Sequence, residues 1–196
     1  MEPYQNTVVS IALEGLVQRS DGSPVTACLQ RCDFVPNIVE LSPVRALLRP
    51  SRHWMVRPDN GTPRHPSTLP PPGDVQLTLK LGSFLGDGRS GIVFDVEQLA
   101  VASLSQNDAS RYSFPPLVVK VARSTRCMSM AREAWFYDHL ECLQGVVIPR
   151  CYGWFELKLP HGCVVPAWTT YPSDDIETDA EEGPAAILGS STWSLR

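Results

Sequence analysis

Three features in the middle of the chain have the residue types and spacing needed to bind a phosphate anion. The first is a glycine loop of pattern G-x-G-x-x-G, which reads Gly86-Asp87-Gly88-Arg89-Ser90-Gly91. The second is Lys120, which lies in an otherwise apolar run, and the third is Glu133, in an expected helix. Glycines let backbone N–H groups approach a phosphate closely, and a lysine held by a glutamate would supply the positive charge.

The residues around the loop decide among the folds that use this pattern. A Walker A loop ends in Gly-Lys-Ser/Thr, but here Gly91 is followed by Ile92, so the loop is not of this type. A dinucleotide-binding loop is followed by a helix. Here the loop is followed by Ile92-Val93-Phe94-Asp95-Val96, which favours a strand. The sequence therefore predicts a glycine loop between two antiparallel strands, either a flap over phosphates or a plain glycine-rich hairpin.

Lys120 and Glu133 each allow two interpretations as well. Lys120 is either partly desolvated on a buried strand, where it needs an anion, or points to solvent from an edge strand. Glu133 lies either beside the apolar stripe of its helix, close to Lys120, or only compensates the helix dipole in the first turn. The combination of loop, lysine and glutamate is more specific than any one of them.

The elements that must position these residues follow from hydrophobic periodicity. Alternating leucines predict a strand over residues 75–81, before the loop, and an apolar run predicts a third strand over residues 117–121. Ser129 can cap a helix that continues to about Leu143, because apolar residues recur on one helical face. Further short strands are expected over residues 146–149, 151–157 and 163–165. The expected fold class is α+β, with an antiparallel meander of strands around the loop.

Composition divides the chain into three parts. Residues 1–73 contain 11 of the 18 prolines and are expected to be a mostly irregular leader that ends in a semi-rigid spacer, Pro70-Pro71-Pro72-Gly73. Residues 74–171 form the expected folded domain. Residues 172–196 are acidic, with few large apolar side chains, and are expected to be a disordered tail or a long surface loop.

Charge and apolar run lengths exclude several classes of protein. A formal net charge of −4 gives no general attraction to nucleic acid. No apolar run approaches the roughly 18–20 residues of a membrane-spanning helix, and the N-terminus lacks the positive end of a secretory signal. We therefore expect an intracellular, cytoplasmic protein whose six cysteines are reduced thiols, with no metal site and no membrane partner.

These motifs together resemble the N-terminal lobe of a eukaryotic-type protein kinase. The resemblance rests on the stretch from Leu85 to Phe94, on Val119-Lys120-Val121 and on Arg132-Glu133-Ala134, and it covers about residues 76–157. The chain is also similar to the divergent protein kinase-like proteins of mushroom-forming fungi. The resemblance implies a five-stranded antiparallel type of sheet with one helix, flanked by the irregular leader and the acidic tail.

The resemblance also implies an ATP site. Glycines 86, 88 and 91 would form the phosphate flap, Leu85 and Val93 would sandwich the adenine, Lys120 would hold the α and β phosphates, and Glu133 would orient Lys120. The implied nucleotide-binding residues are Leu85, Gly86, Asp87, Gly88, Arg89, Ser90, Gly91, Ile92, Val93 and Lys120.

Two catalytic motifs of the family do not occur in the chain, namely His-Arg-Asp and Asp-Phe-Gly. No catalytic residue is identifiable, and Mg²⁺ would be held only if a C-terminal lobe were supplied. We therefore expect an ATP-binding lobe, from a truncated product or a piece of a larger one, that does not transfer phosphate by itself. Two alternatives remain: a non-catalytic, pseudokinase-type module that docks on another protein through the exposed inter-lobe face, and an unrelated β-rich domain with a chance glycine hairpin.

Overall fold

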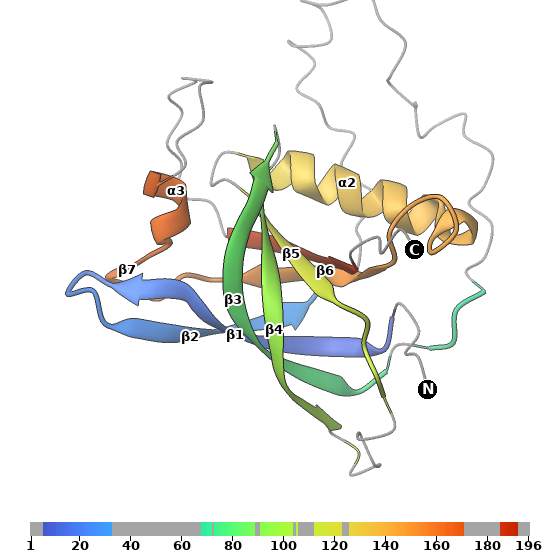
Figure 1. The fold of residues 1–196 in the computed structure, drawn as a ribbon, viewed down its shortest axis with the longest axis horizontal. Helices are drawn as coiled ribbons and strands as arrows, with labels where there is room; N and C mark the ends of the chain where they lie inside the picture. The colour runs from blue at the N-terminus through green and yellow to red at the C-terminus, as the bar shows by residue number, and fades with distance from the viewer. Residues whose placement is uncertain are drawn as a thin grey trace, which may run out of the picture.

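A computed structural model gives the fold of residues 6–32, 68–71, 73–88, 91–103, 105, 112–122, 126–170 and 185–191. Eight strands form one curled sheet, shown in Figure 1. The strands are β1 (Val8–Arg19), β2 (Pro24–Arg31), β3 (Val75–Asp87), β4 (Gly91–Ser103), β5 (Leu117–Ala122), β6 (Cys151–Leu157), β7 (Cys163–Val164) and β8 (Ala185–Ser191).

The strand order closes most of the sheet into a ring. The order is β2-β6-β8-β5-β4-β3-β1-β7, and β2 also pairs with β1, so every strand except β7 belongs to a closed circuit. The pairing of β1 with β3 is parallel, and the other pairings among these strands are antiparallel. The sheet is therefore mixed, and the closed circuit encloses a core.

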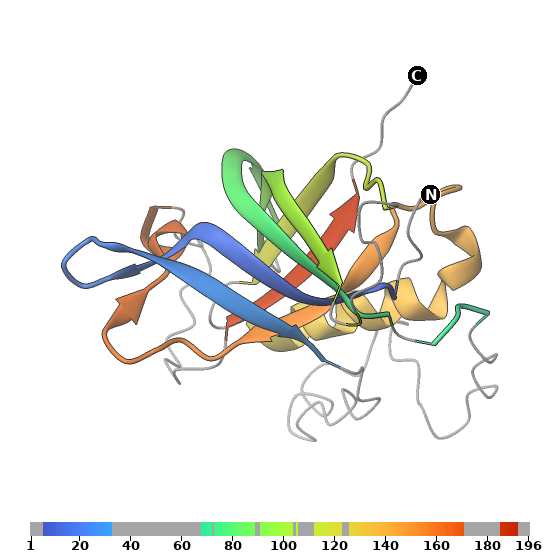
Figure 2. The same cartoon turned by 90° about the horizontal axis from the view of Figure 1, so that it is seen from below.

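Within the described residues, three helical segments accompany the sheet. They are α2 (Cys127–His139), a 3-10 turn η4 (Glu141–Leu143) and α3 (Pro166–Thr170). Helix α2 connects β5 to β6 and lies along one side of the sheet, as Figures 1 and 2 both show. Helix α3 and β7 lie at the far end of the β1–β2 hairpin, where Ser20 N–H donates to the Gly162 carbonyl at 3.0 Å.

The core fills the inside of the ring because apolar residues alternate along its strands. Leu77 and Leu79 of β3, Ile92 and Phe94 of β4, and similar positions on the other strands are buried in one cluster. A smaller cluster of Ala122, Met130 and Ala134 lies on the outside, between the sheet and α2. The residues that face α2 therefore alternate along β5 with those that face the core.

Two strands lie in the segment that the proline pattern led us to expect as mostly irregular. β1 and β2 form a hairpin, and β1 continues the sheet alongside β3, across the expected spacer. Pro24 is tolerated because it is the first residue of β2. Near the spacer, the Asn6 side-chain amide donates to the Pro70 carbonyl, and Gly73 N–H donates to the Asn6 carbonyl at 3.0 Å. The five prolines from residue 36 to residue 63, with Pro66, lie outside the described residues.

Other boundaries differ from the sequence-based expectations. β8 forms within the acidic segment expected to be disordered or a surface loop, and it pairs with both β5 and β6. Helix α2 begins at Cys127 rather than after Ser129, and its N-cap Arg126 has no capping side-chain bond. Residues 146–149 form an exposed turn with one isolated bridge, Gln144 to Ile148, because Gly145 takes a left-handed conformation at φ 77°.

The α+β class is confirmed in a coarse form, since the described residues are mostly sheet with few helices. The sheet has eight strands and is mixed, whereas the sequence predicts about five antiparallel strands. No helix among the described residues is both long and apolar enough to cross a membrane.

Candidate functional site

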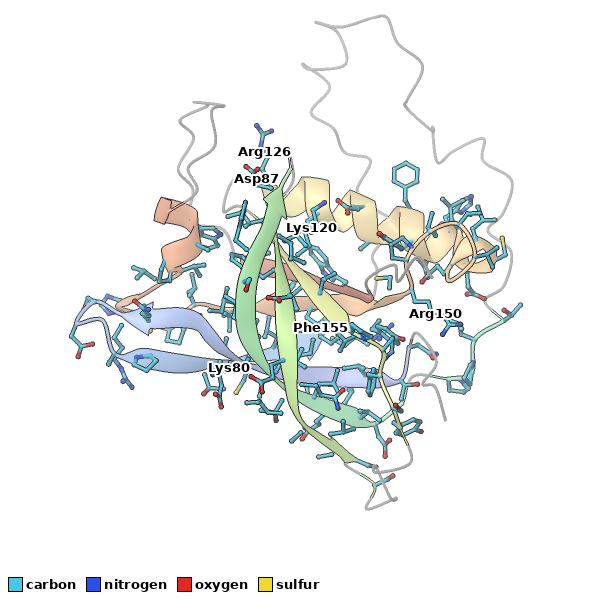
Figure 3. All side chains as sticks on the ribbon, in the orientation of Figure 1. Lys80, Asp87, Lys120, Arg126, Arg150 and Phe155 are labelled. Carbon is cyan, nitrogen blue, oxygen red and sulfur yellow. The ribbon has the colours of Figure 1, made fainter. Side chains whose placement is uncertain are left out.

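Lys120 and Glu133 form an ion pair between the sheet and α2. The Lys120 Nζ lies 2.8 Å from Glu133 Oε1 and 2.6 Å from Oε2, so the ammonium contacts both carboxylate oxygens. The side chains are 20% and 30% exposed, respectively. Figure 3 shows Lys120 reaching from β5 toward α2. Because solvent screens this pair only in part, its charges interact more strongly than they would on an open surface.

Strand periodicity explains why Lys120 faces the helix. Val119 and Val121, its neighbours on β5, are buried in the ring core, so the lysine between them points outward. Val93 of β4 is paired directly with Lys120 and shares its face of the sheet. The Trp168 indole N–H of α3 donates to the Ala122 carbonyl at 2.8 Å, which fixes the end of β5 next to the site.

The structure excludes the alternative interpretations of Lys120 as an edge-strand lysine and of Glu133 as compensation of the helix dipole. Lys120 is not on an edge strand, because β5 lies between β4 and β8. The expectation that Glu133 lies in the first turn of the helix is wrong, because α2 begins six residues earlier and has no acidic residue in its first turn. The helix dipole acts mainly within the terminal turn, so dipole compensation does not account for Glu133.

Gly91, the third glycine of the loop, is required by packing. A Cβ at this position would overlap the Val121 carbonyl oxygen and would lie 2.6 Å from Met130 Cε. Gly91 is paired with Ala122 at the start of β4, and Gly88 N–H donates to the Gly91 carbonyl at 2.9 Å. The absence of a side chain therefore lets the loop, β5 and α2 meet closely.

Packing does not require glycine at positions 86 and 88. Among the residues that the structure describes, a Cβ at Gly86 would meet nothing within 4 Å, and a Cβ at Gly88 would meet only the Gly91 carbonyl oxygen, at 4.0 Å. Neither glycine has a positive φ. Packing and backbone conformation therefore leave both positions open to side chains, and a close ligand approach would give a reason for glycine there.

The remaining residues of the expected site are spread over both faces of the sheet. Leu85 is 53% exposed and lies at a register shift between β3 and β4. Asp87 is exposed at the end of β3, near the tip of the hairpin in Figure 3. Ile92 is fully buried in the ring core, so its side chain does not share the face of Lys120. Arg89 and Ser90 lie outside the described residues.

Sequence reasoning did not assign a site role to two neighbouring residues. Met130 contacts the loop end at Gly91, although its place in the sequence marks it only as part of the apolar stripe of the helix. Asp95 lies on the same face as Val93, and its Oδ1 is buried without a hydrogen-bond partner in the described part of the chain. No sequence signal distinguishes Asp95 from an ordinary polar strand residue.

Two titratable side chains near Glu133 stay neutral at pH 7. Burial, with smaller effects from Cys151 and Glu133, raises the pKa of Tyr137 to about 12. The neighbouring Cys151 thiol is also neutral, because burial raises its pKa to about 12. Within the described ranges no group of three His, Cys, Asp or Glu residues could hold a metal ion. Lys120 and Glu133 therefore offer a ligand an ammonium and its carboxylate partner, on the sheet that carries the loop.

We compared the chain with protein-family models, curated proteins and solved structures, and found no match to any of them.

Proposed function

We propose that the chain binds the phosphates of ATP between the glycine loop and Lys120, as the N-terminal lobe of a protein kinase-like protein. The Lys120–Glu133 ion pair carries the proposal, because Glu133 holds the ammonium on the outer face of the sheet. Gly86 of the loop is in register with Lys120 through Val93, which pairs with both residues. Val93, which is paired with Lys120, would supply an apolar contact for the base. A lysine that was needed only for folding would not require an open glycine loop beside it.

The arrangement of the strands supports the same proposal. Within the larger sheet, β3, β4, β5, β8 and β6 are successive antiparallel neighbours, and α2 joins β5 to β6. A run of five antiparallel strands with one helix is what the resemblance implies, and this agreement supports the proposal. The proposed lobe would not transfer phosphate by itself, because the chain contains neither His-Arg-Asp nor Asp-Phe-Gly.

A thermal-shift titration with Mg-ATP tests the proposal. A ligand at about 100 times its Kd stabilises the native state by about 2.7 kcal/mol, which for a chain of this size raises the melting temperature by roughly 5–10 °C. We expect this rise for the wild type and not for Lys120→Met. Lys80→Met is the matched control, because Lys80 is an exposed lysine on β3, which β4 separates from β5. An equal rise in Lys120→Met would contradict the proposal.

A non-catalytic interaction module is the second candidate, and exposed apolar residues favour it. Val146 and Val147 are 68% and 60% exposed in the turn after η4, and Phe136 and Leu143 are also exposed near them in the sequence. Such residues are typical of a surface that another protein covers. A wild type that shows no stabilisation by Mg-ATP would favour this candidate over nucleotide binding.

A further inference from the structure

Gly91 is the point at which the three elements that form the candidate site meet. It begins β4 directly after the glycine loop, and it packs against the carbonyl of Val121, the residue that follows Lys120 on β5. In the same direction, where a Cβ would lie, it approaches the terminal methyl of Met130 from α2. The loop, the lysine strand and the glutamate helix therefore contact one another at a single residue without a side chain.

Met130 connects this point to the ion pair. Its side chain is fully buried, and it precedes Glu133 by three residues, so the two lie on neighbouring positions of one helical face. Closely packed side chains of this kind do not deform continuously, so a displacement of α2 would move Met130 away from Gly91. The same displacement would carry Glu133 away from Lys120, because both residues belong to one rigid helical segment.

We infer that Met130 is a positioning residue: its contact with Gly91 couples the glycine loop to the Lys120–Glu133 ion pair. This inference rests on the proposed function for the ligand, whereas the contact itself belongs to the protein alone. Phosphates held under the loop would fix the start of β4, and through Met130 they would fix α2 in the position where Glu133 reaches Lys120. Loss of Met130 would act on nucleotide affinity through Glu133, without any contact to the nucleotide.

A thermodynamic cycle on nucleotide affinity tests the inference. We would measure the Kd of Mg-ATP for the wild type, Met130→Ala, Glu133→Gln and the double variant. Leu29→Ala is the matched control, because Leu29 is equally buried but lies in the ring core, on β2. If Met130→Ala does not fold, Met130→Val replaces it, because valine keeps part of the buried volume and withdraws the terminal methyl from Gly91.

We expect Met130→Ala and Glu133→Gln each to weaken binding by about tenfold, and the double variant to bind no more weakly than either one. Leu29→Ala should lower the melting temperature and leave the Kd unchanged. A merely structural role for Met130 would make it behave like Leu29. An unchanged Kd in Met130→Ala, or losses that multiply in the double variant, would overturn the inference.

The same four proteins separate this inference from the proposed function. If the wild type does not bind Mg-ATP, the proposed function fails, and melting temperatures without ligand decide the coupling. In that case we expect Glu133→Gln to lower the melting temperature in the wild-type background and to have no further effect in the Met130→Ala background. An equal loss in both backgrounds would overturn the inference.

Discussion

Gly91 and Gly86 of the loop should respond in opposite ways to substitution by alanine. Gly91→Ala places a methyl group against the Val121 carbonyl and the Met130 side chain, where there is no room for it. Gly86→Ala places the same methyl group in open space on a strand with no positive φ. The first change should therefore destabilise the fold, while the second should affect only a ligand that approaches the loop.

The size of each effect follows from the contacts. A methyl group forced into a close-packed site costs about 1–3 kcal/mol, and the clash at Gly91 involves backbone, which cannot rotate away. Replacing an unstrained glycine with alanine stabilises a protein by about 0.4–1 kcal/mol, through the entropy of the unfolded chain. We therefore expect Gly91→Ala to melt several degrees below the wild type, and Gly86→Ala to melt at or slightly above it.

Thermal and urea denaturation, followed by titration with Mg-ATP, measure both effects. Gly86→Ala should keep its stability and lose affinity for Mg-ATP, because its methyl group would obstruct the approach of the phosphates to the backbone. Gly88→Ala offers a second test of the same kind, since that position is also open. Equal stability of Gly91→Ala and Gly86→Ala would refute the packing argument, and unchanged Mg-ATP affinity in Gly86→Ala would refute the ligand argument.

Two further predictions concern the rest of the fold. Burial raises the pKa of the Cys151 thiol from 9.0 to about 12, so the unfolded state loses this proton first and the free energy of unfolding should fall by about 1.4 kcal/mol per pH unit between those values. In urea denaturation from pH 8 to 10.5, the free energy of unfolding should fall less steeply in Cys151→Ala than in the wild type. An identical slope in the two proteins would contradict this prediction. The Arg31 guanidinium donates to the Val8 and Tyr152 carbonyls at 3.0 and 2.8 Å, so Arg31→Met should cost about 2–3 kcal/mol in urea denaturation. The control Arg19→Met, which loses one exposed bond to Ser23, should change little. Equal losses in the two variants would contradict a stabilising role for the Arg31 bonds to Val8 and Tyr152.

Local periodicity is enough to predict the strands around the loop. The expected strands over residues 75–81, 117–121 and 151–157 lie within β3, β5 and β6, because the apolar pattern that predicts each strand is a property of that segment alone. The helix is also predicted, but its start is not. The N-cap Arg126 makes no capping side-chain hydrogen bond, so no sequence signal marks that boundary.

The ring could not be predicted in this way. The parallel pairing of Val8 with Val75 joins residues far apart in the sequence, and nothing in the local pattern of either segment specifies it. β8 follows an acidic stretch, and its placement depends on the two strands it pairs with. For the site, the motif suggests that Glu133 holds Lys120, and the structure places them in an ion pair, whereas the contact of Gly91 with Met130 depends on packing that the sequence does not show.

The position of β8 has a consequence for the order of events during synthesis. β5, which carries Lys120, has β8 as its second neighbour, and residues 123–184 separate the two strands in the chain. At about 5–20 residues per second, a ribosome needs roughly 3–12 s to synthesise that stretch. For this interval β5 has an unpaired edge, and β6 has one from its own synthesis until β8 is made. Such an edge is a ready template for pairing with another chain, so we expect a chaperone to protect the nascent chain until β8 emerges.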